Sequence, residues 1–262
     1  MTLLEKHFTN LSRSYNDLRT TDPEPVRYVR EKLRGRKTVY GADIGCGGGR
    51  YDLLLMELMP GLSLICVDAN EAMLKETGRL LLSNGHMDFR TLQMNASVMV
   101  LPRDSLDFIT AFNAIHHFDP VDFLQQASSS LKDRGYVFVY TRLRSQNARN
   151  IWGRFFPGFY EKERRLFRMS HIEAWMDRVE GISLSEIVFF KFRRVATLDR
   201  LVSQARNKHY STFSLYDDGE FAESLLLFQE ELQRHFQDLR HIDWIDENVM
   251  LTFRKDLPHG QK

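Results

Sequence analysis

Cysteine is scarce in this chain of 262 residues, which contains only Cys46 and Cys66. Two thiols in apolar surroundings do not make a disulfide scaffold, and they indicate a reducing compartment. No apolar run approaches the ~18 residues of a membrane span. The first residues, MTLLEKHF, lack the pattern of a secretory signal. We therefore expect a cytoplasmic protein without a membrane span.

A surplus of charge of one sign is also missing, because the formal net charge is +1. A chain with so little net charge has no strong global field for a nucleic acid or a membrane surface. We therefore do not expect a nucleic-acid partner. The apolar share of 43% is that of an ordinary globular protein, so the chain can build a sizeable core.

Apolar strand-like segments alternate with amphipathic helical segments in the first half of the chain. The pattern predicts strands at 38–43, 62–68, 87–92, 106–112 and 136–141, and helices at 51–59, 71–83 and 121–132. Such alternation is typical of an α/β fold, with a parallel sheet, right-handed crossovers and helices on both faces. Ligands of these sheets bind beyond the carboxyl ends of the strands.

The flanking segments follow a different order. Apolar stripes predict helices at 3–19 and 25–33, which would form an N-terminal helical cap over 1–36. The core would occupy 37–142. The remainder, 143–262, would add to the same domain a basic and aromatic lid segment, a helical insertion and two late strands, at 185–192 and 248–255.

The stretch VYGADIGCGGGRYDLLL at 39–55 predicts a buried strand ending at Asp43, a glycine-rich turn, and a helix from about Arg50. Glycines permit positive φ and let a ligand lie directly on the backbone. Asp68 ends the next strand, where a carboxylate can bind a ribose. This combination indicates a nucleotide-type cofactor. NAD remains an alternative, although its fingerprint requires glycine where Arg50 stands, and a P-loop is excluded because no GK[ST] follows.

Five segments carry a resemblance to a known family. They are DIGCGGGR at 43–50, VDANEAML at 67–74, MNASVMVLP at 94–102, DFITAFNAIHHF at 107–118 and GYVFVY at 135–140. In this order they resemble the motifs of class I S-adenosylmethionine-dependent methyltransferases, in the type 11/25-like small-molecule group that includes the ubiquinone-biosynthesis type. The resemblance implies a Rossmann-like, doubly wound sheet of seven strands, mostly parallel, with the last strand antiparallel.

The resemblance also implies S-adenosylmethionine as cofactor, S-adenosylhomocysteine as product, and roles for single residues. Asp68 would take the ribose hydroxyls. The methionine end would be held by Asp43 and the backbone at Gly45, Gly47 and Gly49. The adenine and sulfonium side would be lined by Ala69, Met73, Asn95, Ala96, Ser97 and Asn113. Residue 95 is commonly Asp in the family, so this contact would be altered. Tyr15 and Arg19 resemble an N-terminal segment that folds over the cofactor.

His116 and His117 are the candidate catalytic residues, because they follow strand 106–112 at the expected mouth of the site. Histidine can deprotonate a weak nucleophile at neutral pH. The alternative is that a histidine holds its own loop in place. Further ligands at metal-binding spacing are missing, so we expect no metal.

Candidate substrate contacts come from two segments. Residues 142–170 mix arginines with aromatic side chains, which predicts a lid over the substrate or a helix with solvated cations, and nucleic acid could use the same mixture. RNKHYS at 206–211 resembles a substrate-side insertion of carboxylate-methylating relatives. The candidates are Arg142, Trp152, Tyr160, Arg206, His209 and Tyr210.

The expected function is transfer of a methyl group from S-adenosylmethionine to oxygen, nitrogen or carbon of a small metabolite, with a hydroxyl or carboxylate favoured. The alternatives are an RNA or protein methyltransferase, a non-catalytic nucleotide-binding module, and an NAD-dependent oxidoreductase. We expect a monomer or a homodimer.

Overall fold

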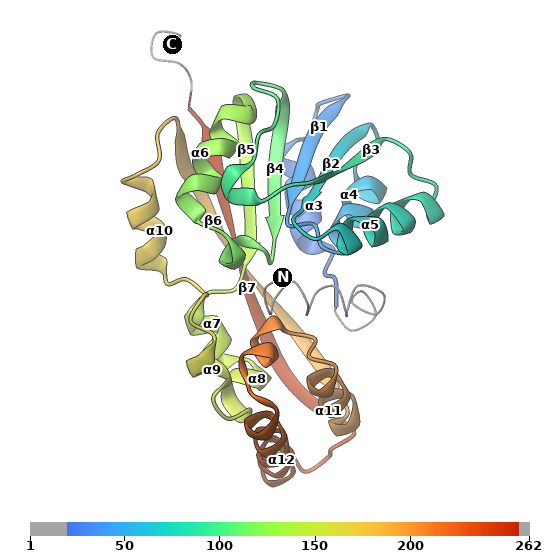
Figure 1. The fold of residues 1–262 in the computed structure, drawn as a ribbon, viewed down its shortest axis with the longest axis vertical. Coiled ribbons are helices and arrows are strands. Elements are labelled where there is room, and N and C mark those ends of the chain that lie inside the picture. Colours follow the sequence, from blue (N-terminus) through green and yellow to red (C-terminus); the bar gives the residue numbers. More distant parts are fainter. Residues whose placement is uncertain (1–19, 257–262) are drawn as a thin grey trace.

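A computed structural model of the protein describes residues 20–256. Its centre is one seven-stranded sheet in the order β3-β2-β1-β4-β5-β7-β6 (Figure 1). β1 to β5 run parallel, and β7 is antiparallel to both of its neighbours, which confirms the predicted fold class. The strands are β1 (Val39–Ile44), β2 (Leu62–Asp68), β3 (Phe89–Gln93), β4 (Leu106–Phe112), β5 (Leu131–Thr141), β6 (Ile182–Ala196) and β7 (Ile242–Lys255).

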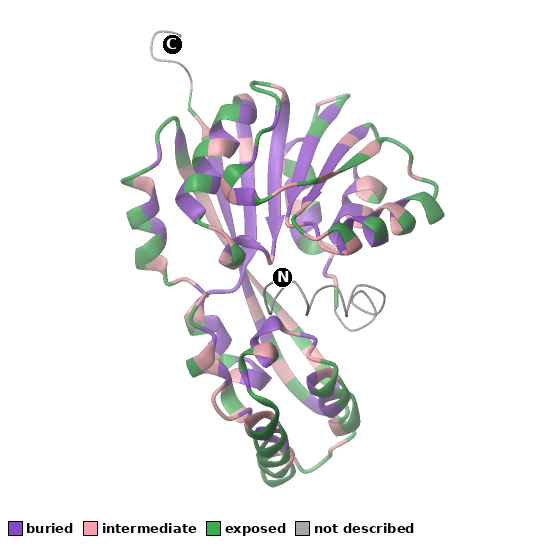
Figure 2. Ribbon diagram, viewed as in Figure 1, coloured by how far each residue is buried: buried purple, intermediate pink, exposed green. Residues whose placement is uncertain are grey.

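Helices cover both faces of the sheet. One apolar cluster joins α3 (Glu24–Lys32), α4 (Arg50–Leu58) and α5 (Glu71–Ser83) to one face. Another cluster joins α6 (Pro120–Ser130) and α10 (Met169–Met176) to the opposite face. Figure 2 shows the strands between these layers as mostly buried. Side chains alternate between the faces of a strand, so an apolar run such as β2 feeds both clusters.

β6 and β7 are longer than the predicted 185–192 and 248–255, because they continue as a paired ribbon beyond the sheet. The far end of this ribbon carries a third apolar cluster, at the bottom of Figure 1. We call this cluster and its helices the lower lobe. Its elements are α7 (Arg144–Arg149), α8 (Ile151–Phe155), α9 (Phe159–Lys162), α11 (Leu198–Arg206), η3 (Ser211–Leu215) and α12 (Asp218–His235).

The remaining short elements are η1 (Ala96–Val98) and η2 (Ile115–His117), which follow β3 and β4. The predicted helix at 3–19 lies outside the described residues. Within residues 20–256 no helix combines the length and the apolar character needed to cross a bilayer.

Candidate cofactor and acceptor site

The candidate site lies at the carboxyl ends of β1 and β4, the neighbouring strands at which the winding direction of the sheet changes. Two cavities meet there. The larger, of about 370 Å³, follows the turn after β1 and the end of β2. The smaller, of about 160 Å³, extends toward the lower lobe. Both are lined by Arg50, Tyr51, Asn113 and His117, so these four residues stand between them.

The turn between β1 and α4 depends on glycine. Gly45 has φ +74°, and a Cβ built there would lie 2.5 Å from the Cβ of Ala114. Gly49 caps α4 at φ +79°, and a Cβ would lie 2.9 Å from the side chain of Thr77. Side chains are therefore excluded at both positions, and the backbone itself forms the wall at Gly45 and Gly47.

Asp68 connects the turn after β1 to the turn after β2 by hydrogen bonds. Its Oδ2 accepts a hydrogen bond of 2.9 Å from the Gly47 amide, and its Oδ1 accepts one of 2.8 Å from the Asn70 amide. Burial raises the pKa of Asp68, while the amides of Asn70 and Gly47 oppose that shift. Each carboxylate oxygen has two lone pairs, so further donors can still bind to this carboxylate.

Two buried carboxyl groups lie beneath the larger cavity. Asp43 is 1% exposed, and its Oδ1 accepts a 2.8 Å hydrogen bond from Thr110. No donor within residues 20–256 reaches its Oδ2. Burial and the charge of Asp52 raise the pKa of Asp43, whereas the Thr110 hydrogen bond lowers it. Burial also raises the pKa of Asp52 to about 7, although the neighbouring Cys66 thiol acts in the opposite direction.

The segment after β4 brings strained backbone and two histidines to the junction of the cavities. Asn113 has φ +54°, and its amide donates a 2.7 Å hydrogen bond to the Tyr140 carbonyl. Non-glycine residues with positive φ cluster at functional sites. The rings of His116 and His117 lie 4.1 Å apart. His117 lines both cavities, whereas His116 lines only the smaller one.

The smaller cavity is walled by aromatic side chains of the lower lobe and the ribbon, among them Trp152, Phe159, Tyr210 and Trp244. Trp152 packs 5.0 Å from the ring of His209. The His209 Nδ1 lies 3.0 Å from the carbonyl oxygen of Gln204. A carbonyl only accepts, so the hydrogen of neutral His209 belongs on Nδ1 and its lone pair on Nε2.

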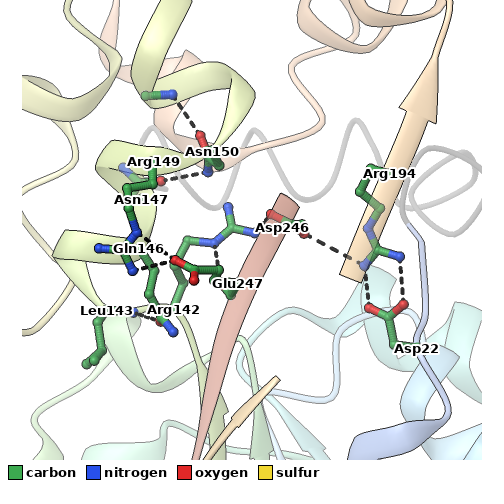
Figure 3. A network of polar contacts seen from close by, with 11 residues as sticks. Asp22, Arg142, Leu143, Gln146, Asn147, Arg149, Asn150, Arg194, Asp246 and Glu247 are labelled. Atoms are coloured by element: carbon green, nitrogen blue, oxygen red, sulfur yellow. Dashed lines mark hydrogen bonds and ion pairs between the residues drawn. The ribbon is translucent and has the colours of Figure 1, made fainter. Parts of the chain in front are cut away.

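A chain of ion pairs crosses the same cavity (Figure 3). Asp22 accepts two hydrogen bonds from Arg194, of 2.8 and 2.5 Å. Arg194 also lies 3.7 Å from Asp246. Asp246 in turn accepts a short hydrogen bond from the buried Arg142. The network joins the segment before α3 to β6, β7 and the end of β5, and it fixes the position of the ribbon at the site.

The structure brings most of the residues predicted for the cofactor together. Within the described part of the chain, all but Gly49 and Ser97 line the larger cavity. Gly49 caps α4, and the Ser97 amide donates to Asn95 Oδ1. Tyr15 and Arg19 lie outside the described residues.

Of the predicted substrate residues, four line the smaller cavity: Arg142, Trp152, His209 and Tyr210. Tyr160 instead accepts a hydrogen bond from Arg144, and Arg206 is exposed at the end of α11. The sequence did not single out Asp22, Arg194, Arg200 or Asp246 as part of this site. No cluster of histidine, cysteine or acidic side chains suited to a metal ion occurs in residues 20–256.

Comparison with known proteins identifies the domain. Residues 42–139 match the family described as "Methyltransferase domain". A ubiquinone biosynthesis O-methyltransferase from Nitrosomonas europaea is 28% identical over 142 residues, which are 53% of this chain and 58% of that protein. The chain therefore matches little more than half the length of this curated relative.

Solved structures show the same fold. The YcgJ protein of Bacillus subtilis has a TM-score of 0.63 at 15% identity, over 90% of this chain and 99% of that one. The phosphoethanolamine N-methyltransferase 2 of Haemonchus contortus, in complex with S-adenosyl-L-methionine, has a TM-score of 0.55 at 15% identity, over 90% of this chain and 52% of that one.

Residues 42–139 therefore match a methyltransferase domain, and the strand order and the glycine turn are those expected of the class I S-adenosylmethionine-dependent methyltransferase fold. S-adenosylmethionine is the cofactor of this class. The residues present fit that cofactor, because the larger cavity offers a side-chain-free backbone wall and the unpaired, buried Oδ2 of Asp43.

Proposed function

We propose that this chain transfers a methyl group from S-adenosylmethionine to a small molecule bound in the smaller cavity, with a hydroxyl or a carboxylate as the favoured acceptor. The observation that carries this proposal is the meeting of two cavities at Arg50, Tyr51, Asn113 and His117. One cavity has the features of a nucleotide-type site, and the other is small and aromatic. A methyl donor and an acceptor need this kind of adjacency.

The residues of the larger cavity would hold the cofactor by polar and apolar contacts. Asp68 would accept hydrogen bonds from the ribose hydroxyls with the lone pairs that its two amide partners leave. Asp43 would accept one from the methionine end through Oδ2. Met73 and Ala96 are buried apolar walls suited to the adenine. The bound cofactor supplies a methyl group on a positively charged sulfur.

The acceptor side would act mainly by orientation. Holding two reactants in line is worth roughly 7–11 kcal/mol of a reaction barrier. The backbone N–H of Asn113 donates a hydrogen bond to the Tyr140 carbonyl, which holds this residue's backbone at the junction of the cavities. His117 lines both cavities and is therefore the better placed of the two histidines to take a proton from the acceptor. Residues of the lower lobe would enclose the acceptor.

Calorimetry with S-adenosylhomocysteine tests the cofactor site, and methyl transfer from a labelled donor to a metabolite collection tests the reaction. We expect binding in the micromolar range, and labelling of a small molecule rather than of total RNA or protein. Asp68→Ala should weaken binding, whereas Asp88→Ala, an exposed acid before β3, should not. Absence of any heat at millimolar ligand would refute the cofactor assignment, and label confined to RNA or protein would refute the acceptor class.

A further inference from the structure

We propose that the acceptor carries a negative charge, which Arg200 binds, and an apolar part about the size of one aromatic ring. This inference rests on the proposed function and specifies its substrate as a small aryl or similarly shaped carboxylate.

The charges that line the smaller cavity do not balance. Within residues 20–256 its charged lining consists of four cations and three anions, Arg50, Arg142, Arg194 and Arg200 against Asp22, Glu163 and Asp246. A cationic acceptor would be repelled by the surplus positive charge, and an anionic acceptor would be attracted by it.

Each of the three carboxylates already has a guanidinium partner. Asp22 is bound by Arg194 through two hydrogen bonds, and Asp246 is bound by Arg142 (Figure 3). Glu163 accepts hydrogen bonds of 2.9 and 2.5 Å from Arg165, which is not itself part of the cavity lining. These pairs neutralise one another, so the carboxylates are not available to the two remaining cations.

Those two cations are Arg50 and Arg200. Among residues 20–256, Arg50 donates only to uncharged oxygens, the Thr20 carbonyl at 2.7 Å and the Thr21 hydroxyl at 3.2 Å. It lines both cavities, so the cofactor's own carboxylate can also use it. Arg200 lines the smaller cavity but not the larger one. No group in the described part of the chain pairs with its guanidinium. It is exposed at the rim, where it can meet an incoming anion.

Arg200 lies on the face of α11 that lines the cavity, whereas the other arginine near the end of this helix does not. Residues four apart lie on the same helix face, and both Arg200 and Gln204 line the cavity. Arg206 is two residues beyond Gln204, on a different face, and is exposed outside the lining. One helix thus offers a cation at the cavity and a second cation away from it, which makes Arg206 a matched control.

The volume and the lining of the smaller cavity indicate the size and character of the acceptor's uncharged part. Its volume is about 160 Å³. Cavities of about 150 Å³ hold a benzene ring. Among the cavity's aromatic lining residues, Tyr210 and Trp244 are half-buried and can offer ring faces to this space, whereas Trp152 and Phe159 are almost fully buried. Planar apolar groups pack well on such faces.

Binding of matched acids and amides tests the inference directly. Benzoate and phenylacetate are titrated against benzamide and phenylacetamide, with saturating S-adenosylhomocysteine and again without it, for the wild type, Arg200→Gln and Arg206→Gln. A charge-assisted contact predicts at least roughly tenfold tighter binding of each acid than of its amide. Arg200→Gln should remove most of this preference, and Arg206→Gln should keep it.

Three outcomes would overturn the inference: equal binding of acid and amide, no binding of any probe, or an acid preference that survives in Arg200→Gln. The failure of the proposed function is a separate result, because it shows as absent binding of S-adenosylhomocysteine. The titrations without that ligand still decide whether the smaller cavity selects anions.

Discussion

Replacing Asp52 by asparagine should flatten the pH dependence of the protein's stability. Asp52 is 0% exposed in the first turn of α4, and burial raises its pKa from 3.8 to about 7. In the unfolded chain the same carboxyl would ionise near its ordinary value. Between these two pH values the folded protein therefore holds a proton that the unfolded chain has lost.

The sign follows from proton linkage. Since the folded state binds more protons, its stability falls as the pH rises through this window, and the loss is complete above about pH 7. The full shift of about three pKa units corresponds to roughly 4 kcal/mol, of which roughly 2–3 kcal/mol falls between pH 5 and pH 8. Asparagine has the shape of the protonated acid but cannot ionise, so Asp52→Asn avoids the loss.

Thermal unfolding at pH 5 and at pH 8 measures the effect. For a chain of this size 1 kcal/mol shifts Tm by roughly 2–4 °C, so the Tm of Asp52→Asn relative to the wild type should rise by roughly 5–10 °C between the two pH values. Asp122→Asn is the control, because Asp122 occupies the first turn of α6 but is exposed. Parallel Tm profiles for the wild type and Asp52→Asn would refute the reasoning.

Three further substitutions probe the site. Asp68→Asn places an amide against the N–H of Gly47 or Asn70, so calorimetry should show roughly 10–100-fold weaker binding of S-adenosylhomocysteine. Gly45→Ala should destabilise the protein by more than Gly85→Ala, because Gly85 has a similar φ of +81° but open space around it, and chemical denaturation would measure the difference. His117→Asn should lower methyl transfer roughly 10²-fold or more while S-adenosylhomocysteine still binds, and equal losses in both assays would contradict a role in proton transfer.

The cofactor half of the site was predictable because its residues are close in sequence and their patterns are local. The glycine turn can be recognised from a stretch of about ten residues, and so can the acid at the end of the next strand. Parallel pairing of β1 with β2 and β4 then brings Asp43 beside Cys66 and Thr110. This local coding explains why the fold class was predicted correctly and why most of the residues predicted for the cofactor line one cavity.

The acceptor half was less predictable because it depends on long-range register. Arg194 and Asp246 reach the cavity only because β6 and β7 continue in pairing as far as Ala196 and Ile242. The distal part of β6 alternates half-buried and exposed side chains, so its sequence has no apolar run that marks it as strand. The choice between Arg200 and Arg206 likewise required the phase of α11, which the motif RNKHYS does not contain.

The two halves of the site therefore have different physical origins, and this bears on where specificity resides. The larger cavity is built from the ends of β1, β2 and β4, which the sheet itself holds in place. The aromatic wall of the smaller cavity comes from the lower lobe and the ribbon, whose apolar cluster is separate from the two clusters of the sheet. Substitutions in the lower lobe can change the acceptor without disturbing the sheet that binds the cofactor. The ion pairs from Asp22 through Arg194 and Asp246 to Arg142 form a polar link between these parts, so in the proposed reaction they would set how accurately the acceptor faces the methyl donor.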